Sequence, residues 1–100
     1  MHARRFHFEW DEIKAAANAR KHAVSFEVAR TGFNDPLLLT VADLVHGETE
    51  ERWFSIRRAR NGSMLSVVYL WSEADPATKI RIISARKATQ AEIRQYEESL

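Results

Sequence analysis

Positively charged side chains are concentrated in one part of this 100-residue chain. Positions 52 to 87 hold eight lysine or arginine residues and two acidic residues, whereas the whole chain carries 15 basic and 14 acidic residues. A field of one sign over one region favours binding of a polyanion such as nucleic acid. The alternative is a solvated sheet edge, because charged side chains also protect exposed strands from aggregation. The eight cationic residues are Arg52, Arg57, Arg58, Arg60, Lys79, Arg81, Arg86 and Lys87.

Phosphate chemistry in this chain would depend on these cationic side chains. The sequence has three glycines and contains none of the glycine-rich loops that hold phosphates through backbone amides. Arginine is suited to binding phosphate without such a loop, because its planar guanidinium group donates paired hydrogen bonds to phosphate oxygens.

The four histidines are the side chains best suited to proton transfer near neutral pH. His22 ends a predicted helix, where it is either a cation that stabilises the last carbonyls or a proton-transfer group. His2, His7 and His46 are weaker candidates, because they lie at the terminus, in an alternating strand and in a turn. No two histidines are spaced to share a helix face and there is no cysteine, so we expect no metal site and no cofactor.

The three tryptophans lie on or next to predicted strands. We expect Trp10, Trp53 and Trp71 to pack in the core, because large aromatic side chains bury the most apolar surface. Trp53 also alternates with Arg52, so it is a candidate for stacking on a nucleic-acid base.

The elements that position these side chains form an α+β domain. A period of 3.6 predicts helices early and late in the chain, and a period of two predicts strands between them. Short connections make the strands antiparallel neighbours, and the most apolar strand, 65–72, should be central. We therefore expect one domain, residues 1–100, with a mainly antiparallel sheet and helices packed on one face. The predicted order β-α-α-β-β-β-β-α corresponds to residues 5–10, 12–22, 26–33, 37–43, 52–58, 65–72, 79–87 and a helix from 89.

Polar and small residues mark where the helices begin, end and pack. Ser25 and Thr89 are predicted N-caps, and Thr89 with Glu92 forms a capping-box pattern. Gly32 should end the second helix in a left-handed conformation. The first helix should pack through a narrow stripe, which consists of Ile13, Ala16, Ala17 and Arg20.

Strand geometry decides which arginines share a surface. Under strict alternation, Arg81 and Arg86 face opposite sides of their strand. A bulge at the adjacent Ile82 and Ile83 would turn the later side chains to the other face. The strand at 52–58 leaves the same question open, because alternation alone does not decide which of its arginines are exposed.

The sequence predicts no membrane contact. The longest uninterrupted apolar run, Val67 to Trp71, is far too short to span a bilayer. The basic N-terminus lacks the apolar core of a signal peptide, and the absence of cysteine fits a reducing compartment. We therefore expect a cytoplasmic protein.

Three stretches of the sequence resemble the BrnT family of toxins. They are FEWDEIKAAANARKHAVSFEVA near the start, EERWFSI in the middle and RIISARKATQAEIRQYE at the end, in the order of the family. The most specific features are the RIISAR run before a T-x-x-E helix and the Asn-x-x-Lys-His helix end before Ser-Phe. One position departs from the family, which usually has glycine where this chain has Ala23. A left-handed turn there would be strained by the β-carbon.

The resemblance implies a RelE-like fold and a ribonuclease toxin of a type II toxin–antitoxin system. Such toxins stop translation by cutting RNA. The implied partner is a BrnA-like antitoxin, in a heterotetramer of two toxins and two antitoxins that represses its operon by binding operator DNA through the antitoxin. Two alternatives stay open: a non-catalytic nucleic-acid-binding module, and a degenerate toxin that acts only in a repressor complex.

The implied reaction is metal-independent cleavage of RNA. The ribose 2′-hydroxyl attacks the neighbouring phosphate, and preplaced guanidinium groups stabilise the charge that builds on the phosphate oxygens. On this reading Arg52, Arg81 and Arg86 are the catalytic phosphate clamps, and His22 transfers protons. The residues expected to hold the RNA backbone are Lys21, Arg57 and Lys87.

Overall fold

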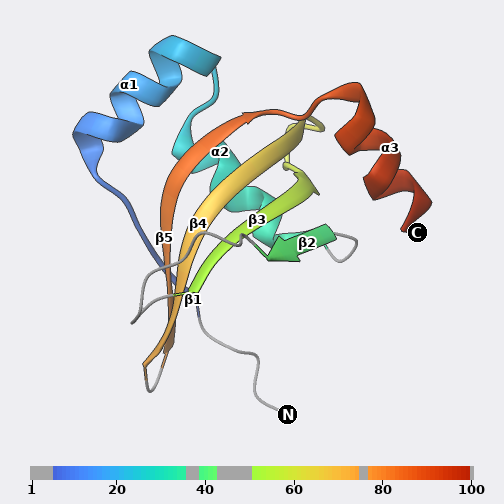
Figure 1. Ribbon diagram of the computed structural model, residues 1–100. Coiled ribbons are helices and arrows are strands. Elements are labelled where there is room, and N and C mark those ends of the chain that lie inside the picture. The colour runs from blue at the N-terminus through green and yellow to red at the C-terminus, as the bar shows by residue number, and fades with distance from the viewer. Residues whose placement is uncertain (1–5, 36–38, 43–50, 75–76, 100) are drawn as a thin grey trace.

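A mixed sheet of five strands organises the computed structural model, which describes residues 6–35, 39–42, 51–74 and 77–99 (Figure 1). The helices and strands are β1 (Phe6–Glu9), α1 (Glu12–His22), α2 (Phe26–Thr31), the 3₁₀ helix η1 (Gly32–Asn34), β2 (Leu39–Ala42), β3 (Glu51–Arg58), β4 (Met64–Ala74), β5 (Ala77–Lys87) and α3 (Gln90–Glu98). The strands lie in the order β1-β5-β4-β3-β2. Neighbours from β2 to β5 are antiparallel, and β1 is parallel to β5.

This arrangement confirms the α+β class and the mainly antiparallel sheet. The most apolar strand, β4, is central as expected, because it pairs with β5 along one edge and with β3 along the other. No helix in the described part of the chain is long and apolar enough to cross a membrane.

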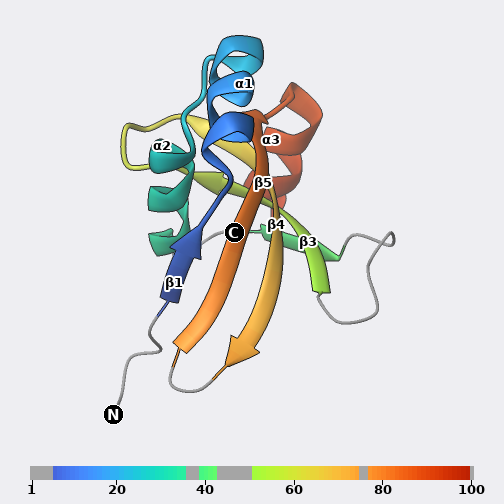
Figure 2. The same ribbon diagram turned by 90° about the vertical axis from the view of Figure 1, so that its left-hand side faces the viewer.

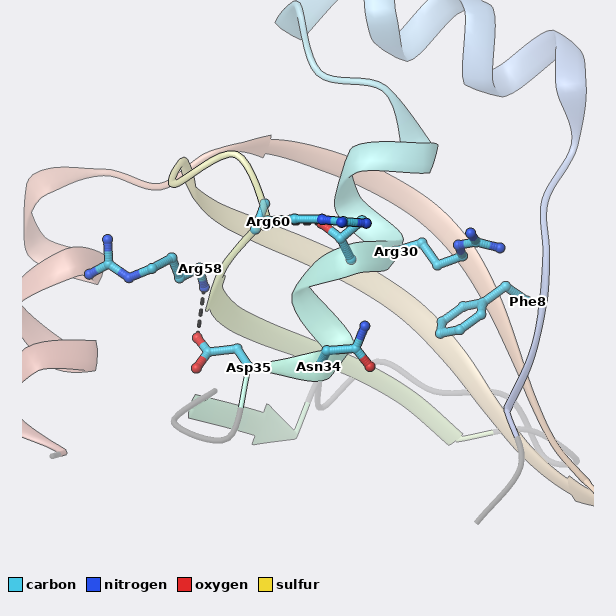
Figure 3. A pocket seen from close by; sticks show the side chains of 8 residues that line it. Phe8, Arg30, Asn34, Asp35, Arg58 and Arg60 are labelled. Carbon is cyan, nitrogen blue, oxygen red and sulfur yellow. Dashed lines mark hydrogen bonds between the residues drawn. The ribbon is translucent and has the colours of Figure 1, made fainter. Parts of the chain in front are cut away.

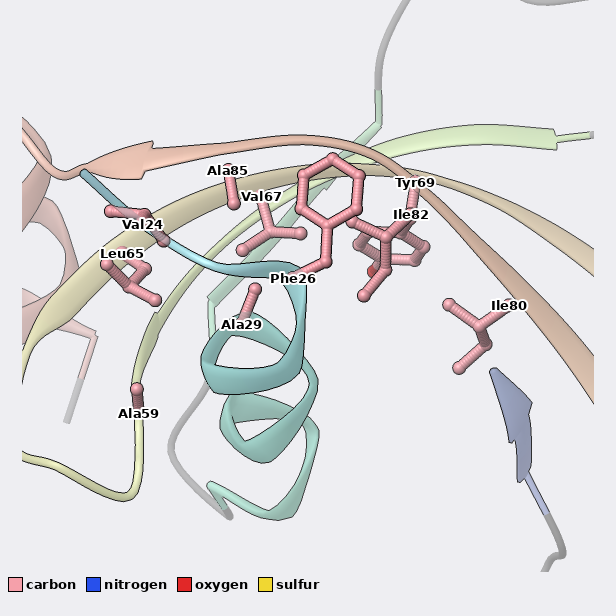
Figure 4. Close-up of a cluster of buried hydrophobic side chains, with 10 residues drawn as sticks. All are labelled: Val24, Phe26, Ala29, Ala59, Leu65, Val67, Tyr69, Ile80, Ile82 and Ala85. Carbon is pink, nitrogen blue, oxygen red and sulfur yellow. The ribbon is translucent and has the colours of Figure 1, made fainter. Parts of the chain in front are cut away.

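The main core lies between α2 and one face of the sheet (Figure 4). Phe26 and Ala29 on α2 are buried against strand residues that point to the same side of the sheet. Burial of a side chain such as Phe26 stabilises the fold by about 2–3 kcal/mol. The strand residues of this cluster are Leu65, Val67, Tyr69, Ile80, Ile82 and Ala85.

The last helix packs on the opposite side of the sheet, so the expectation of helices on one face is wrong. Figure 2 shows the sheet between α2 and α3. Ile56 and Tyr96 are buried but do not belong to the core cluster under α2. The Tyr96 hydroxyl donates to Asp35 Oδ2 at 2.8 Å, which ties α3 to the segment after η1. Because the chain leaves β5 at the end of the sheet, α3 can fold over the other face there.

The first helix is attached to the sheet through a polar residue rather than through the predicted stripe. Ile13 is 81% exposed, whereas Asn18 is buried. The Asn18 side chain donates to the carbonyls of Val24 (3.1 Å) and Ala85 (2.8 Å) and accepts from the Ala85 amide at 3.2 Å. β1 pairs with β5 only as far as Arg81, so beyond it Asn18 takes the place of a strand at the edge of β5.

The predicted helix starts are confirmed. Ser25 Oγ accepts from the Val28 amide at 3.1 Å, and Thr89 and Glu92 form both bonds of a capping box. Between α1 and α2, Ala23 adopts the left-handed conformation with φ 57° and ψ 31°. The β-carbon strain that the departure from the family suggested is therefore present at this position.

Gly32 has a different role from the one predicted. Its φ of −67° and ψ of −16° are right-handed, and the chain continues into η1. A β-carbon at this position would collide with Cγ and Cδ of Arg57. Glycine is needed here for the close approach of a buried side chain rather than for a left-handed turn.

Candidate nucleic-acid interface

A bulge in β5 brings Arg81 and Arg86 to the same face of the sheet. In the register of β4 and β5, Ile82 and Ser84 lie opposite consecutive residues of β4, so Ile83 has no partner. An extra residue reverses the alternation of every side chain that follows it. The bulge at the Ile82-Ile83 pair is therefore present, and the later arginine turns to the side of the earlier one.

On the side of the sheet opposite α2, α3 covers one end, where Ile56 and Ser66 are buried; we call the part that α3 leaves uncovered the open face. Arg52 lies opposite Leu70, which in turn lies opposite Arg81. Directly opposed residues point to the same side, so the two arginines flank the leucine with Cα atoms about 10 Å apart. Arg86 is opposite Ser66, four residues along β4, which is about 13 Å away. The open face comprises His7, Glu9, Arg52, Phe54, Val68, Leu70, Lys79, Arg81, Ser84 and Arg86.

Arg81 is held by a carboxylate from the neighbouring edge strand. Its Nη1 donates to Glu9 Oε2 at 2.9 Å, and Lys79 Nζ lies 3.7 Å from Glu9 Oε1. The parallel pairing of β1 with β5 puts Glu9 directly opposite Arg81. The Arg81 side chain stays 38% exposed, so it is fixed in direction and still open to a ligand.

Arg86 is held on the open face by a carboxylate of α3. Its two terminal nitrogens donate to the two oxygens of Glu92 at 2.8 and 2.9 Å. Ser66 Oγ and the Thr89 amide also donate to Glu92, each at 2.8 Å. The Arg86 hydrogen bonds, with the Thr89 amide and the Ser66 hydroxyl, lower the pKa of Glu92 to about 2. The Arg86 side chain is 40% exposed, and the hydrogen bonds that it donates to Glu92 raise the pKa of Arg86.

The other predicted contacts to RNA do not lie on the open face. Lys87 is opposite Leu65 on β4, so it points to the side of α2 and lines a small pocket at the turn between α1 and α2. Lys21 is exposed on the last turn of α1. His22, also on that turn, is half-buried, and its side chain forms no hydrogen bond or ion pair with any described residue. His2 and His46 lie outside the described residues.

Arg57 is placed where it cannot reach RNA. It is 0% exposed, and its guanidinium carbon lies 3.5 Å from the centre of the Phe33 ring and 5.3 Å from that of Tyr69. No hydrogen-bond partner of its guanidinium nitrogens is present among the described residues. Burial lowers the pKa of Arg57 to about 10. Its assignment to the RNA backbone is therefore incorrect for this structure, because alternation on β3 points Arg57 to the side of α2 and Arg52 to the opposite side.

The tryptophans pack as expected. Trp10, Trp53 and Trp71 lie against the core cluster. Trp10 makes an edge contact with Phe26, with ring centres 6.0 Å apart. Trp53 thus points away from the open face, so the candidate role in base stacking does not fit its position.

Two acidic residues of the site were not found by sequence reasoning. The sequence showed Glu92 as part of a capping box but not as the partner of Arg86. The two residues are six positions apart, one at the end of a strand and the other at the start of a helix, and no sequence pattern predicts that they pair. Glu9 could be found only from the parallel pairing of β1 with β5, which connects residues 72 positions apart. Within the described residues, no three histidine, aspartate or glutamate side chains are grouped to hold a metal ion.

The open face is suited to binding a chain of phosphates. Three arginines surround an apolar floor of Leu70, Val68 and Phe54. Guanidinium groups bind phosphate oxygens in pairs, and apolar side chains contact bases without reading their sequence.

A comparison with known families supports a nucleic-acid enzyme. Residues 10–92 match the family described as "Ribonuclease toxin, BrnT, of type II toxin-antitoxin system". A comparison with curated proteins gave no match.

Proposed function

Because this chain belongs to the BrnT family of ribonuclease toxins, we propose that it cuts RNA on the open face of its sheet without a metal ion. The observation that carries the proposal is the shared face of Arg52, Arg81 and Arg86, which depends on the bulge at Ile83. Without that bulge the arginines would be divided between two sides of the sheet, and no single RNA strand could contact all of them.

The proposed reaction uses the RNA's own 2′-hydroxyl as the nucleophile. Its oxygen forms a bond to the neighbouring phosphorus while the bond from phosphorus to the 5′ oxygen of the next nucleotide breaks. The products are a 2′,3′-cyclic phosphate and a free 5′-hydroxyl. Negative charge grows on the phosphate oxygens in the transition state, and one preplaced donor there typically contributes about 3–4 kcal/mol.

The carboxylates beside the arginines give them fixed positions. An arginine side chain has five N–H donors, so a guanidinium that uses one or two on a carboxylate retains others for phosphate. Glu9 and Glu92 thus orient Arg81 and Arg86 before RNA binds. Prepositioned donors need no reorganisation as charge develops, which is why such groups lower the barrier.

Glu9 is proposed for the proton transfers, because it lies in the same row as Arg81 and Leu70. His22 has the chemistry required near neutral pH, but it lies on the last turn of α1 rather than on the open face. Glu92 is unsuited to this task, because its lowered pKa makes its carboxylate a poor proton acceptor.

Lys21 and Lys87 are proposed to contact the RNA backbone beyond the cleaved bond.

The biological setting is also proposed from the family. The chain would inhibit translation in the cytoplasm and be neutralised by a BrnA-like antitoxin, in a heterotetramer of two toxins and two antitoxins. The antitoxin would carry the contact with operator DNA. The fold is proposed to be RelE-like.

A second candidate is a toxin that binds RNA without cutting it. The observation in its favour is that Arg81 and Arg86 are each paired with a carboxylate of the same chain. In this case the protein would act through its antitoxin complex alone.

An assay of RNA cleavage in the presence of a chelator distinguishes a toxin that cuts RNA from one that only binds it. The purified protein is incubated with a short RNA and excess EDTA, and a second RNA carries one 2′-deoxyribose at the cut position. We expect cleavage of the first RNA with a 2′,3′-cyclic phosphate end, and no cleavage of the second at that position. Binding without cleavage would favour the non-catalytic candidate, and cleavage of both RNAs would exclude attack by the 2′-hydroxyl.

A further inference from the structure

A second concave site lies between α2, η1 and the end of β3 (Figure 3). It has a volume of about 640 Å³, which is within the range of pockets that hold small molecules. Arg30 and Arg60 stand at its rim, and Phe8 and Asn34 lie beside them. The site is on the α2 side of the sheet and shares none of the open-face arginines.

Two guanidinium groups in this pocket have no acidic partner among the residues that the structure describes. Neither Arg30 nor Arg60 forms a side-chain hydrogen bond or ion pair with any residue that the structure describes. Arg30 instead lies over Phe8, with its guanidinium carbon 5.8 Å from the ring centre. The Arg60 amide donates to Thr31 Oγ1 at 2.9 Å, which holds the loop against α2. Figure 3 shows both arginine side chains extended in the same direction.

The carboxylate that lines this pocket is engaged elsewhere. Asp35 Oδ2 accepts from the Arg58 amide at 2.9 Å and from the Tyr96 hydroxyl at 2.8 Å. In Figure 3 the Asp35 carboxylate is turned toward Arg58, whose side chain points away from the other two arginines. Arg30 and Arg60 therefore form a concave site of positive charge, unlike Arg81 and Arg86, which are each neutralised by a carboxylate.

We propose that this pocket binds a nucleoside monophosphate, either as a free nucleotide or as the phosphorylated end of an RNA strand. A terminal phosphate carries a charge of about −2, which two guanidinium groups can neutralise through paired hydrogen bonds. A phosphodiester within a strand carries half that charge. Phe8 offers an apolar surface to the base, and the Asn34 amide offers both a donor and an acceptor. This site is independent of the cleavage chemistry on the open face.

Direct binding to the full-length chain tests the proposal. Calorimetric titrations with AMP, adenosine and inorganic phosphate show whether the phosphate and the base are both needed. We expect AMP to bind at least about tenfold more tightly than adenosine, because the nucleoside lacks the group that the arginines hold. Equal affinity for AMP and adenosine would overturn the proposal.

Variants locate the bound nucleotide. Arg30→Ala and Arg60→Ala should each weaken AMP binding by about tenfold or more, since each removes charge-assisted hydrogen bonds. Arg94→Ala, an exposed arginine on α3, is the matched control and should bind AMP as the native chain does. Unchanged affinity in both pocket variants would place the nucleotide elsewhere and contradict the proposal. Circular dichroism spectra confirm that each variant is folded.

The source of the phosphate is decided by a further titration. The ligands are an uncut 2′-O-methyl oligonucleotide with a 5′-phosphate, the same strand with a 5′-hydroxyl, and a glutamate-rich peptide. Preference for the phosphorylated strand over AMP identifies an RNA end, and preference for AMP identifies a free nucleotide. Tighter binding of the acidic peptide than of either would overturn the proposal in favour of a protein partner. RNA cleavage should persist in Arg30→Ala and Arg60→Ala, so failure here is distinct from failure of the proposed reaction.

Discussion

Arg81 and Arg86 point to the same side of β5, because Ile83 is an extra residue between them. Five sequence positions would otherwise separate them onto opposite faces. The bulge also keeps Ala85 in the core with Ile82. One irregularity thus satisfies the packing of the buried face and gathers positive charge on the open face, as is common for bulges next to functional sites.

Replacing the carboxylate that holds Arg86 should change the pH dependence of stability. Glu92 has a pKa lowered from 4.5 to about 2 in the folded chain. Its contribution is therefore complete above about pH 4.5 and is lost as the pH falls toward 2. Glu92→Gln should lower the free energy of unfolding by about 1 kcal/mol at pH 7, a modest value because the Arg86 side chain is partly exposed.

Urea denaturation at pH 7 and pH 3 measures this effect. The difference between the native chain and Glu92→Gln should shrink at pH 3, because Glu92 is protonated there in the unfolded chain and folding must release that proton. Glutamine can keep the capping box, and Thr89→Ala, which removes the cap without touching the ion pair, should cost about 1 kcal/mol at both pH values. A Glu92→Gln difference that is equal at pH 7 and pH 3 would show that the ion pair contributes nothing.

The left-handed residue between α1 and α2 offers a stabilising substitution. Ala23→Gly removes the clash of the β-carbon with the backbone and should raise the free energy of unfolding by about 1 kcal/mol. Thermal denaturation should then show a midpoint about 4–8 °C higher. Ala17→Gly, at an exposed position inside α1, is the control and should lower stability by about 1 kcal/mol. Loss of stability in both variants would contradict the left-handed conformation.

Gly32 and Arg57 should be energetically coupled. Gly32→Ala introduces a β-carbon that collides with the buried Arg57 side chain and should cost about 2 kcal/mol or more. Arg57→Ala removes the colliding atoms, so the double variant should be more stable than the sum of the two single effects predicts. Gly62→Ala is the control, because its β-carbon meets nothing within 4 Å and its strain should not depend on Arg57. Chemical denaturation of the four chains gives the coupling, and strict additivity would contradict the contact.

Local signals allowed most of the elements to be predicted. The N-caps at Ser25 and Thr89 depend on neighbours within three residues, so the sequence alone is sufficient for them. The Ile82-Ile83 pair suggested the bulge, because two adjacent large apolar residues break a period of two. This pair alone could not show whether the bulge forms, because that depends on the register of β5 with β4.

The errors have a common physical cause. The predicted stripe with Ile13 failed because Asn18 binds the backbone of Ala85, and nothing near Asn18 in sequence indicates that partner. Arg57 was wrongly predicted to contact RNA because it is buried against the ring of Phe33, which lies 24 positions earlier in the chain. Contacts between distant segments are set by tertiary packing, which local patterns do not determine.

The rate of RNA cleavage by single arginine variants tests the central claim most directly. Arg52→Ala, Arg81→Ala and Arg86→Ala should each lower the cleavage rate of one short RNA by about 10² to 10³, because each removes a donor to the transition state. Arg94→Ala, which removes an exposed arginine outside the open face, should cleave at the native rate. If the three open-face variants, shown to be folded, cleave as fast as Arg94→Ala, the open face is not where this protein cuts RNA.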